Sequence, residues 1–288
     1  MKTVLLTGVE GFTGRHLVQY LTTRGHKCLS LDVDIRNRES TQKAVSDLAD
    51  EHSIDAVIHL AAISFVQHDD ASEIYQVNVI GTENLLCAIE KAHITPRVIL
   101  ASSANVYGIP PDSQPLEESQ CSAPNNHYAC SKLAMEMMAK TFQHKFSIIV
   151  VRPFNYTGIN QDKKFLVPKI ADHFVRRSTV IELGNLEICR DFSSIDDVCE
   201  VYENLLHLNN ASFEVVNIAS SHLVSIQEII SFCEAETGHK IRINQNHALV
   251  RNADIPAMCG SSVKLNRLIN FTPKKENFWI TLKRMLKA

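Results

Sequence analysis

The sequence predicts an α/β fold, in which a doubly wound parallel sheet is followed by a smaller C-terminal portion. Two observations support this prediction. Strand-like and helix-like segments alternate through the first half of the chain, and the strand-like runs are apolar on both faces. Strands of this kind are typical of a parallel sheet that is covered by helices on each side.

The first half supplies five strands and four helices. A strand over residues 2–7 ends in a glycine turn, and the helix that follows it over 12–23 is closed by Gly25, as a left-handed cap residue would do. The later segments alternate in the same way, with strands at 27–31, 56–60, 97–101 and 147–151 and helices at 39–51, 74–92 and 128–142.

The pattern of predicted elements changes after Pro153, where the loops become longer and the strands shorter. We therefore expect a first domain over residues 1–155, to which a segment near 191–220 returns, and a smaller portion over 156–190 and 221–288. The second half is predicted to contain short strands at 180–183, 215–218 and 241–243 and helices at 196–208 and 225–237.

The composition excludes several functional classes. Lys and Arg number 29 against 32 Asp and Glu, a net charge of −3, so no general basic field exists to hold a nucleic-acid backbone. The longest apolar stretches are too short to span a bilayer, and Gly8, Glu10 and Gly11 interrupt the start before it resembles a signal peptide. The eight cysteines and thirteen histidines lack metal-site spacing, so we expect reduced thiols, no metal and a cytoplasmic protein.

The junction of the first strand and the first helix carries Gly8, Gly11 and Gly14 in the pattern G-x-x-G-x-x-G. A backbone without Cβ atoms turns tightly and approaches a pyrophosphate closely, and the helix N-terminus adds free N–H donors. This motif predicts a Rossmann-type dinucleotide-binding domain, with the smaller portion left to bind substrate.

The segment after the second strand bears on the cofactor's ribose. Asp32 can accept hydrogen bonds from the adenosine ribose, which favours NAD, because a carboxylate repels a 2′-phosphate. Arg36 and Arg38 lie just downstream and could bind such a phosphate, whereas Asp34 and Ile35 could cap the adenine. The sequence therefore leaves the choice between NADH and NADPH open.

A tyrosine and a lysine four residues apart begin the helix at 128–142, so both project from one face. An ammonium near a phenol favours the phenolate, and we expect Lys132 to lower the pKa of Tyr128 from about 10 towards neutrality. Ser103 follows the strand at 97–101, at the sheet edge where α/β proteins place functional groups. The three side chains suit proton transfer coupled to hydride transfer.

With these motifs the sequence resembles the extended short-chain dehydrogenase/reductase superfamily, in its nucleotide-sugar epimerase/dehydratase group. The similar motifs run almost from end to end: T-G-x-x-G-F-x-G at 7–14, H-L-A-A at 59–62, N-x-x-G-T at 78–82, S-S-x-x-V-Y-G at 102–108, Y-x-x-S-K at 128–132 and R-P-F-N at 152–155. The second half, around Arg190-Asp191-Phe192 and Arg251 to Pro256, resembles GDP-6-deoxy-4-keto-mannose reductases.

The resemblance implies roles for individual residues. Ser103 would hydrogen-bond the reacting oxygen, Tyr128 would be the acid/base, and Lys132 would tune Tyr128 and hold the nicotinamide ribose. The implied cofactor-binding residues are Gly8, Gly11, Phe12, Thr13, Gly14, Asp32, Asp34, Ile35, Leu60, Ala61, Ala62, Tyr128 and Lys132. The implied substrate-binding residues are Asn155, Val167, Arg190, Arg251 and Asp254, with the two arginines on the diphosphate and nucleotide ribose.

The residues after Ser103 narrow the reaction. Related 4,6-dehydratases carry an Asp-Glu pair there, because eliminating water needs its own acid and base. Here the positions hold Ala104 and Asn105, neither of which transfers a proton. We therefore expect a reductase of a GDP- or dTDP-linked 4-keto-6-deoxyhexose that uses NAD(P)H, as in deoxysugar or lipopolysaccharide biosynthesis. The alternatives are a 4-epimerase with tightly bound NAD and a cofactor-binding regulator without activity.

A homodimer is also expected from the helices at 74–92 and 128–142. They carry apolar residues beyond one face, including Met135, Met137 and Met138, and members of the family pair such helices.

Overall fold

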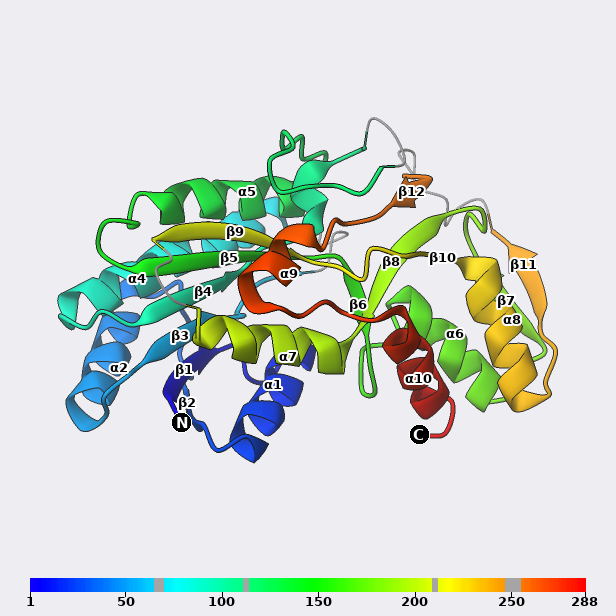
Figure 1. Cartoon of the computed structure of the whole chain (residues 1–288), viewed down its shortest axis with the longest axis horizontal. Helices are drawn as coiled ribbons and strands as arrows, with labels where there is room; N and C mark the ends of the chain where they lie inside the picture. The colour runs from blue at the N-terminus through cyan, green and yellow to red at the C-terminus, as the bar shows by residue number, and fades with distance from the viewer. Residues whose placement is uncertain (65–69, 111–113, 209–211, 247–254) are drawn as a thin grey trace.

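A computed structural model of the chain describes residues 1–64, 70–110, 114–208, 212–246 and 255–288. Its main sheet has six strands, all paired in parallel, in the order β2-β1-β3-β4-β5-β9 (Figure 1). The strands are β1 (Thr3–Thr7), β2 (Lys27–Ser30), β3 (Ala56–His59), β4 (Arg97–Ala101), β5 (Ser147–Pro153) and β9 (Phe213–Ile218). Because β1 lies between β2 and β3, the chain reverses its direction across the sheet there, and ligands of open α/β sheets bind in the crevice that this reversal creates.

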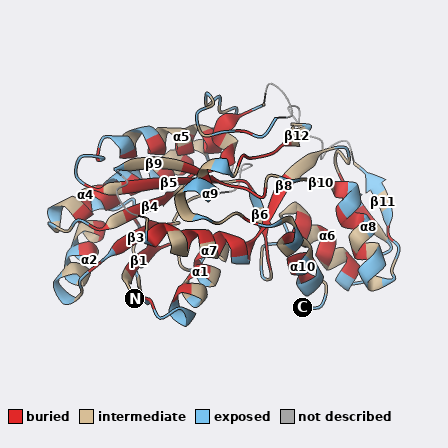
Figure 2. Cartoon of the chain, in the orientation of Figure 1, coloured by how far each residue is buried: buried red, intermediate tan, exposed pale blue. Residues whose placement is uncertain are grey.

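Helices cover both faces of the main sheet, which confirms the predicted α/β architecture (Figure 1). One face packs against α1 (Phe12–Thr23) and α7 (Ile195–Leu206). The other face packs against α2 (Arg38–Glu51), α4 (Thr82–Lys91) and α5 (His127–Lys140). The strands contribute residues to both apolar clusters, and Figure 2 shows that they are buried along most of their length.

The prediction of one continuous helix over residues 74–92 is wrong, although the segment is helical. The segment is divided into α3 (Ala71–Tyr75), a π-helix η1 (Gln76–Gly81) and α4. Gly81 ends the π-helix where it crosses Ile35, and a Cβ on Gly81 would lie 2.6 Å from the Ile35 side chain. The periodicity of apolar residues does not report such a contact, which depends on a segment more than forty residues away. π-helical turns occur often at functional sites.

The second group of elements has its own apolar cluster, formed mainly by α6, α8 and α10. Its helices are α6 (Leu166–Val175), α8 (Ile226–Thr237) and α10 (Lys275–Met285), while α9 (Val263–Ile269) packs beside β9. Its strands are β6 (Asn155–Thr157), β7 (Val180–Leu183), β8 (Cys189–Ser194), β10 (Leu223–Ser225), β11 (Arg242–Gln245) and β12 (Ala257–Met258). β8 pairs with β6, β10 and β12, and β11 pairs with β7.

Asp191 of β8 ties these elements to the end of β9. Its side chain is fully buried; Oδ1 accepts hydrogen bonds from the N–H of Ser220 at 2.9 Å and from its hydroxyl at 2.6 Å. Oδ2 accepts from the N–H of Ser221 at 2.9 Å and of Gly260 at 3.2 Å. Burial raises the pKa of Asp191, and the Ser220 hydrogen bonds oppose that rise. This carboxyl therefore fixes β8 where the two groups of elements meet.

Within the described residues, no helix combines the length and the apolar character that crossing a membrane requires.

Candidate active site

The glycine turn, residues 8–14, forms a cradle so tight that Cβ atoms at Gly8 and Gly14 would clash with backbone atoms. Gly8 has a φ of +69°, and a Cβ there would lie 2.7 Å from the backbone nitrogen of Ala61. A Cβ on Gly14 would lie 2.2 Å from the carbonyl oxygen of Gly8. Gly11 precedes α1 as its N-cap and donates its N–H to that same oxygen at 3.1 Å, and it offers no side chain to cap the helix. The first-turn N–H groups of α1 therefore face a space that suits a pyrophosphate.

A chain of hydrogen bonds behind the cradle fixes the end of β3. The hydroxyl oxygen of Thr7 accepts from the N–H groups of Leu60 at 3.2 Å and Ala61 at 3.1 Å, and it lies 2.7 Å from Nδ1 of His59. Nε2 of His59 lies 2.9 Å from the hydroxyl of Thr82, which itself donates to the carbonyl of Asn78. Since the Thr82 proton is used there, Nε2–H of His59 donates to Thr82 and its Nδ1 accepts from Thr7.

Burial lowers the pKa of His59 to about 3, and the charge of Lys132 contributes in the same direction. The imidazole is therefore neutral at every pH at which the protein would work. His59 is thus a structural link that sets the backbone at Leu60 and Ala61 beside Gly8.

Asn78, within the π-helix, anchors the next residues of the same loop. Its Oδ1 accepts from the N–H of Ile63 at 2.9 Å, and its Nδ2 donates to the carbonyl of Ile63 at 3.1 Å and to the hydroxyl of Ser131 at 3.0 Å. Ser131 in turn donates to the carbonyl of Tyr128 at 2.7 Å. One amide therefore joins the loop after β3 to the first turn of α5, which carries the tyrosine and the lysine.

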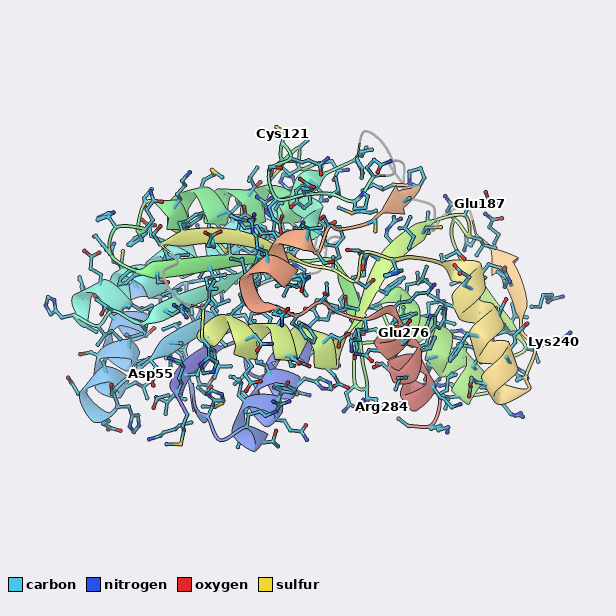
Figure 3. All side chains as sticks on the ribbon, in the orientation of Figure 1. Asp55, Cys121, Glu187, Lys240, Glu276 and Arg284 are labelled. Atoms are coloured by element: carbon cyan, nitrogen blue, oxygen red, sulfur yellow. The ribbon has the colours of Figure 1, made fainter. Side chains whose placement is uncertain are left out.

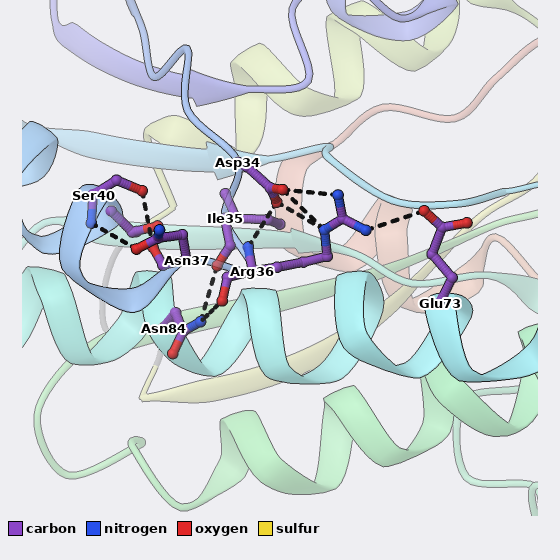
Figure 4. Close-up of polar contacts among 8 residues, drawn as sticks. Asp34, Ile35, Arg36, Asn37, Ser40, Glu73 and Asn84 are labelled. Carbon is purple, nitrogen blue, oxygen red and sulfur yellow. Dashed lines mark hydrogen bonds and ion pairs between the residues drawn. The ribbon is translucent and has the colours of Figure 1, made fainter.

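The segment after β2 forms an acidic network around one guanidinium, which Figure 4 shows. Arg36 donates from Nε and Nη2 to both oxygens of Asp34 at 2.8–3.0 Å, and from Nη1 to Glu73 of α3 at 3.1 Å. These hydrogen bonds lower the pKa of Asp34. The side chain of Asn84 donates to the carbonyls of Ile35 and Arg36 and holds the segment in place. Asp32 is exposed at the end of β2.

Ser103 and Tyr128 meet at the carboxyl end of β4. Both are buried, with 7% of each residue exposed, and the side chain of Ser103 contributes to lowering the pKa of Tyr128. Lys132, one turn further along α5, is 3% exposed and donates from Nζ to the carbonyl of Ala101 at 2.7 Å. Burial lowers the pKa of Lys132 to about 8, although Glu136 opposes this shift. The three side chains predicted from the sequence thus converge at one sheet edge.

The expected lowering of the pKa of Tyr128 is wrong for this structure. Burial raises it to about 12, the hydrogen bond with Ser103 opposes the rise, and nearby Tyr156 adds to it. The spacing of Tyr128 and Lys132 on the helix correctly places both on one face, but the ammonium is directed to the carbonyl of Ala101. The cost of removing a phenolate from water therefore dominates, and the phenol keeps its proton at neutral pH.

A buried ion pair lies behind this group. Arg152 of β5 donates to both oxygens of Glu136, at 3.0 Å from Nε and 2.6 Å from Nη2, and these side chains are 6% and 1% exposed. The hydroxyl of Ser102 also donates to Glu136, at 2.5 Å. Glu136 is one turn beyond Lys132 on α5, so its charge reaches the ammonium.

The residues predicted to bind substrate differ in how exposed their side chains are. Asn155 is exposed and donates to the carbonyl of Asp191 at 3.3 Å, and Arg190 donates to the carbonyls of Cys189 and Ile255 at 2.9 and 2.6 Å. Val167 is 2% exposed within the apolar cluster around α6, so its side chain is not open to a ligand. Arg251 and Asp254 lie outside the described residues.

The residues expected to line the cofactor surround the cradle. Thr13 hydrogen-bonds the hydroxyl of Tyr156 at 2.8 Å, and the ring of Phe12 stacks on that of Tyr156 with centroids 6.1 Å apart. Leu60, Ala61 and Ala62 are partly exposed at the end of β3, next to Gly8. Ile35 is buried against Gly81, so the adenine cap that was considered for its side chain is not open.

The glycine cradle fits a dinucleotide, because its close approaches leave room only for hydrogen at Gly8 and Gly14 and no side chain of Gly11 caps α1. The segment after β4 brings a hydroxyl, and the first turns of α5 bring a protonated phenol and an ammonium, to the same sheet edge. This combination defines a class, the NAD(P)-dependent oxidoreductases with a Rossmann-type sheet. Residues 4–219 match the model of the NAD dependent epimerase/dehydratase family, and the chain belongs to that family.

Two relatives and one solved structure are similar to this chain over most of its length. The chain is 35% identical to a GDP-6-deoxy-D-talose 4-dehydrogenase of Aggregatibacter actinomycetemcomitans over 91% of this chain and 89% of that protein. It is 30% identical to a GDP-6-deoxy-D-mannose reductase of Pseudomonas aeruginosa over 99% and 95%. The solved structure of RMD from Pseudomonas aeruginosa complexed with NADPH superposes with a TM-score of 0.91 at 28% identity, covering 100% of this chain and 98% of that one.

Two parts of the site were not predicted from the sequence. The motifs around His59 and Asn78 were recognised, but the hydrogen-bond chain that they form was not, because its partners are 15 to 53 residues away. The contact of Asn105 with Ser103 was also missed, although the two are only two residues apart.

Proposed function

We propose that this protein reduces the 4-keto group of a nucleotide-activated 4-keto-6-deoxyhexose. The observation that carries the proposal is a buried phenol, Tyr128, that is protonated at neutral pH and lies with Ser103 and Lys132 at the sheet edge. A reductase must donate a proton to the new alkoxide, so its acid has to start the reaction protonated. Ala104 and Asn105 supply no second acid or base, which argues against a dehydratase.

The proposed roles follow from these positions. Reduced nicotinamide, when bound, would supply the hydride to C4. Tyr128 donates its phenolic proton to the C4 oxygen, and Ser103 donates a hydrogen bond to the same region, which stabilises the developing negative charge. The ammonium of Lys132 lies one turn behind and holds the nicotinamide ribose. The glycine cradle at Gly8 and Gly14 holds the pyrophosphate.

We also propose that the nucleotide part of the substrate binds the smaller portion over residues 156–190 and 221–288, opposite the dinucleotide-binding domain over 1–155. Arg190 and Arg251 would bind the diphosphate, Asp254 the ribose hydroxyls and Asn155 the sugar, and Val167 would contribute through its backbone. The relatives that act on GDP-linked 6-deoxy sugars support this assignment. The proposed location is the cytoplasm, where the products would feed deoxysugar and lipopolysaccharide biosynthesis.

A homodimer is proposed from the surface of η1 and α5. Met135 is fully buried in the core, but Met137 is 55% exposed and Ile80 of η1 is 38% exposed, so apolar side chains remain on the outer surface of both elements. A second copy of the chain would cover them. Light scattering after size exclusion tests this, and a monomer at micromolar concentration would contradict it.

The direct test uses purified protein with NADH or NADPH and GDP- or dTDP-linked 4-keto-6-deoxy sugars. We expect oxidation of the cofactor and one equivalent of reduced sugar for each equivalent oxidised. No turnover with any of the substrates would reject the proposal. If NAD co-purifies with the protein and a 4-hydroxy sugar is inverted at C4 without added reductant, the protein is a 4-epimerase instead.

We further expect NADH to bind more tightly than NADPH. A 2′-phosphate needs a free cation, but Arg36 already donates to two carboxylates, Asp34 and Glu73. Asp32 adds a third negative charge to the segment after β2. Titration calorimetry should give a Kd for NADPH that is at least about tenfold higher, since the carboxylates repel the 2′-phosphate.

Removing the two carboxylates should narrow this difference. The double variant Asp34→Ser and Glu73→Gln releases Arg36, and we expect its Kd for NADPH to fall while its Kd for NADH stays within about threefold. The control is Glu187→Gln, because Glu187 is exposed at the opposite end of the molecule from the main sheet (Figure 3). Equal wild-type affinity for the two cofactors would contradict the prediction.

A further inference from the structure

Asn105 uses both lone pairs of the Ser103 hydroxyl. Ser103 is the N-cap of a short 3-10 helix, η2 (Ala104–Tyr107), and its Oγ accepts the backbone N–H of Asn105 at 3.1 Å. The same Oγ accepts a second hydrogen bond from the side-chain Nδ2 of Asn105 at 3.0 Å. A serine hydroxyl has two acceptor positions and one proton. With both acceptor positions filled by one residue, only the proton is left for other partners.

The geometry leaves Ser103 only one way to act on Tyr128. Because Asn105 fills both acceptor positions of the Ser103 oxygen, a hydrogen bond between Ser103 and the phenol oxygen has to be donated by Ser103. A bond donated to the phenol oxygen stabilises the phenolate, which agrees with the contribution of Ser103 against the rise in the pKa of Tyr128. The phenolic proton of Tyr128 is then left to point to a substrate oxygen.

We propose that Asn105 is a positioning residue, which fixes Ser103 as a hydrogen-bond donor to Tyr128 and so leaves the phenolic proton of Tyr128 directed to the reacting oxygen. The inference rests on the proposed reductase function. Asn105 is half-buried and acts through Ser103, so we do not assign it a contact with the substrate. Its amide suits this task because Nδ2 can only donate. A carboxylate at the same position could only accept, and it would turn the Ser103 proton away from Tyr128.

The variant Asn105→Asp tests this directly, since it keeps the shape and replaces the donor by an acceptor. At pH 7 we expect kcat to fall about 10- to 100-fold, less than the roughly 10²- to 10³-fold loss for a donor that itself contacts the oxyanion, because Asn105 acts through Ser103, and KM to change less than about threefold. Asn105→Ala removes only one of the two donors, because the backbone N–H remains. Its loss should be smaller and should add no pH dependence.

The pH profile separates a positioning role from a structural one. The introduced carboxyl has a reference pKa of about 4. It becomes a donor again when it is protonated, so the kcat of Asn105→Asp should rise relative to wild type as pH falls from 8 to 5, by up to about tenfold over the whole range. The matched control is Asn266→Asp on the exposed surface of α9, which should follow wild type at every pH. A profile of Asn105→Asp that is parallel to wild type would overturn the inference.

A second measurement does not depend on the substrate. The ζ carbon of tyrosine reports hydrogen bonds to its oxygen, so carbon-13 labelling of tyrosine, with Tyr128→Phe to assign the signal, follows the Ser103 contact in the protein without substrate. We expect the Tyr128 signal to shift in Asn105→Asp and to stay in place in Asn266→Asp. An unmoved signal would overturn the inference. Failure of wild type to reduce any 4-keto sugar would instead reject the proposed function and leave this result intact.

Discussion

Replacing Tyr128 with Phe should lower kcat about 10²- to 10⁴-fold in the reduction of a 4-keto sugar, the range expected for losing a positioned general acid. The change removes one oxygen from a residue that is 7% exposed, and the ring remains to fill its place. No other acid takes over, because Ala104 and Asn105 cannot donate a proton as acids. Steady-state kinetics with NADH should show the loss in kcat, while the Kd for NADH by calorimetry should stay within about threefold.

The wild-type pH profile belongs to the same prediction. Since burial raises the pKa of Tyr128 to about 12, its proton is present throughout the neutral range and is lost only as pH rises towards that value. Reduction should therefore show no loss from this phenol between pH 6 and 8. The matched control is Tyr20→Phe on the surface of α1, where the hydroxyl only accepts from Arg24. If Tyr128→Phe retained full kcat, the proposed proton donor would be wrong.

Short-range patterns in the sequence predicted the parts of the site that local structure builds. The glycine turn was predicted because Gly8, Gly11 and Gly14 lie within one strand-to-helix junction, where Gly8 and Gly14 leave no room for a Cβ. The shared face of Tyr128 and Lys132 follows from helix geometry alone. The alternation of strands and helices gave the parallel sheet for the same reason, because burial on both faces leaves a continuous apolar run.

Properties that depend on tertiary contacts were not available from the sequence. The pKa of Tyr128 was predicted in the wrong direction because its burial and the direction of the Lys132 ammonium are set by the packing of α5 on β4. The π-helix after Tyr75 depends on the approach of Ile35 to Gly81. Arg36 was considered a phosphate ligand, and only the fold shows that Glu73 approaches it from a different element.

Replacing Glu136 with Leu should have the largest effect on stability, because it leaves Arg152 buried without a counter-charge. The pair is almost fully enclosed, and Arg152 already has one buried nitrogen, Nη1, with no partner among the described residues. Burial alone would lower the pKa of Arg152, and Glu136 more than reverses this. Removing one partner of such a pair costs about 3–5 kcal/mol, so we expect the Tm to fall by about 10 °C in a thermal melt.

The double variant Glu136→Leu and Arg152→Leu separates the cost of the orphaned charge from the cost of the altered packing. Two apolar side chains at these positions leave no buried ion, so the double variant should be more stable than Glu136→Leu alone. Glu187→Gln, at an exposed position, should melt with wild type. A double variant that is less stable than Glu136→Leu alone would mean that the orphaned charge does not dominate the loss, and it would contradict the prediction. Glu136 also raises the pKa of Lys132, so in Glu136→Leu the ammonium should lose its proton below pH 8, and activity should decline at a lower pH than in wild type. The ion pair therefore connects the stability of the sheet edge to the charge of the lysine that faces the cofactor.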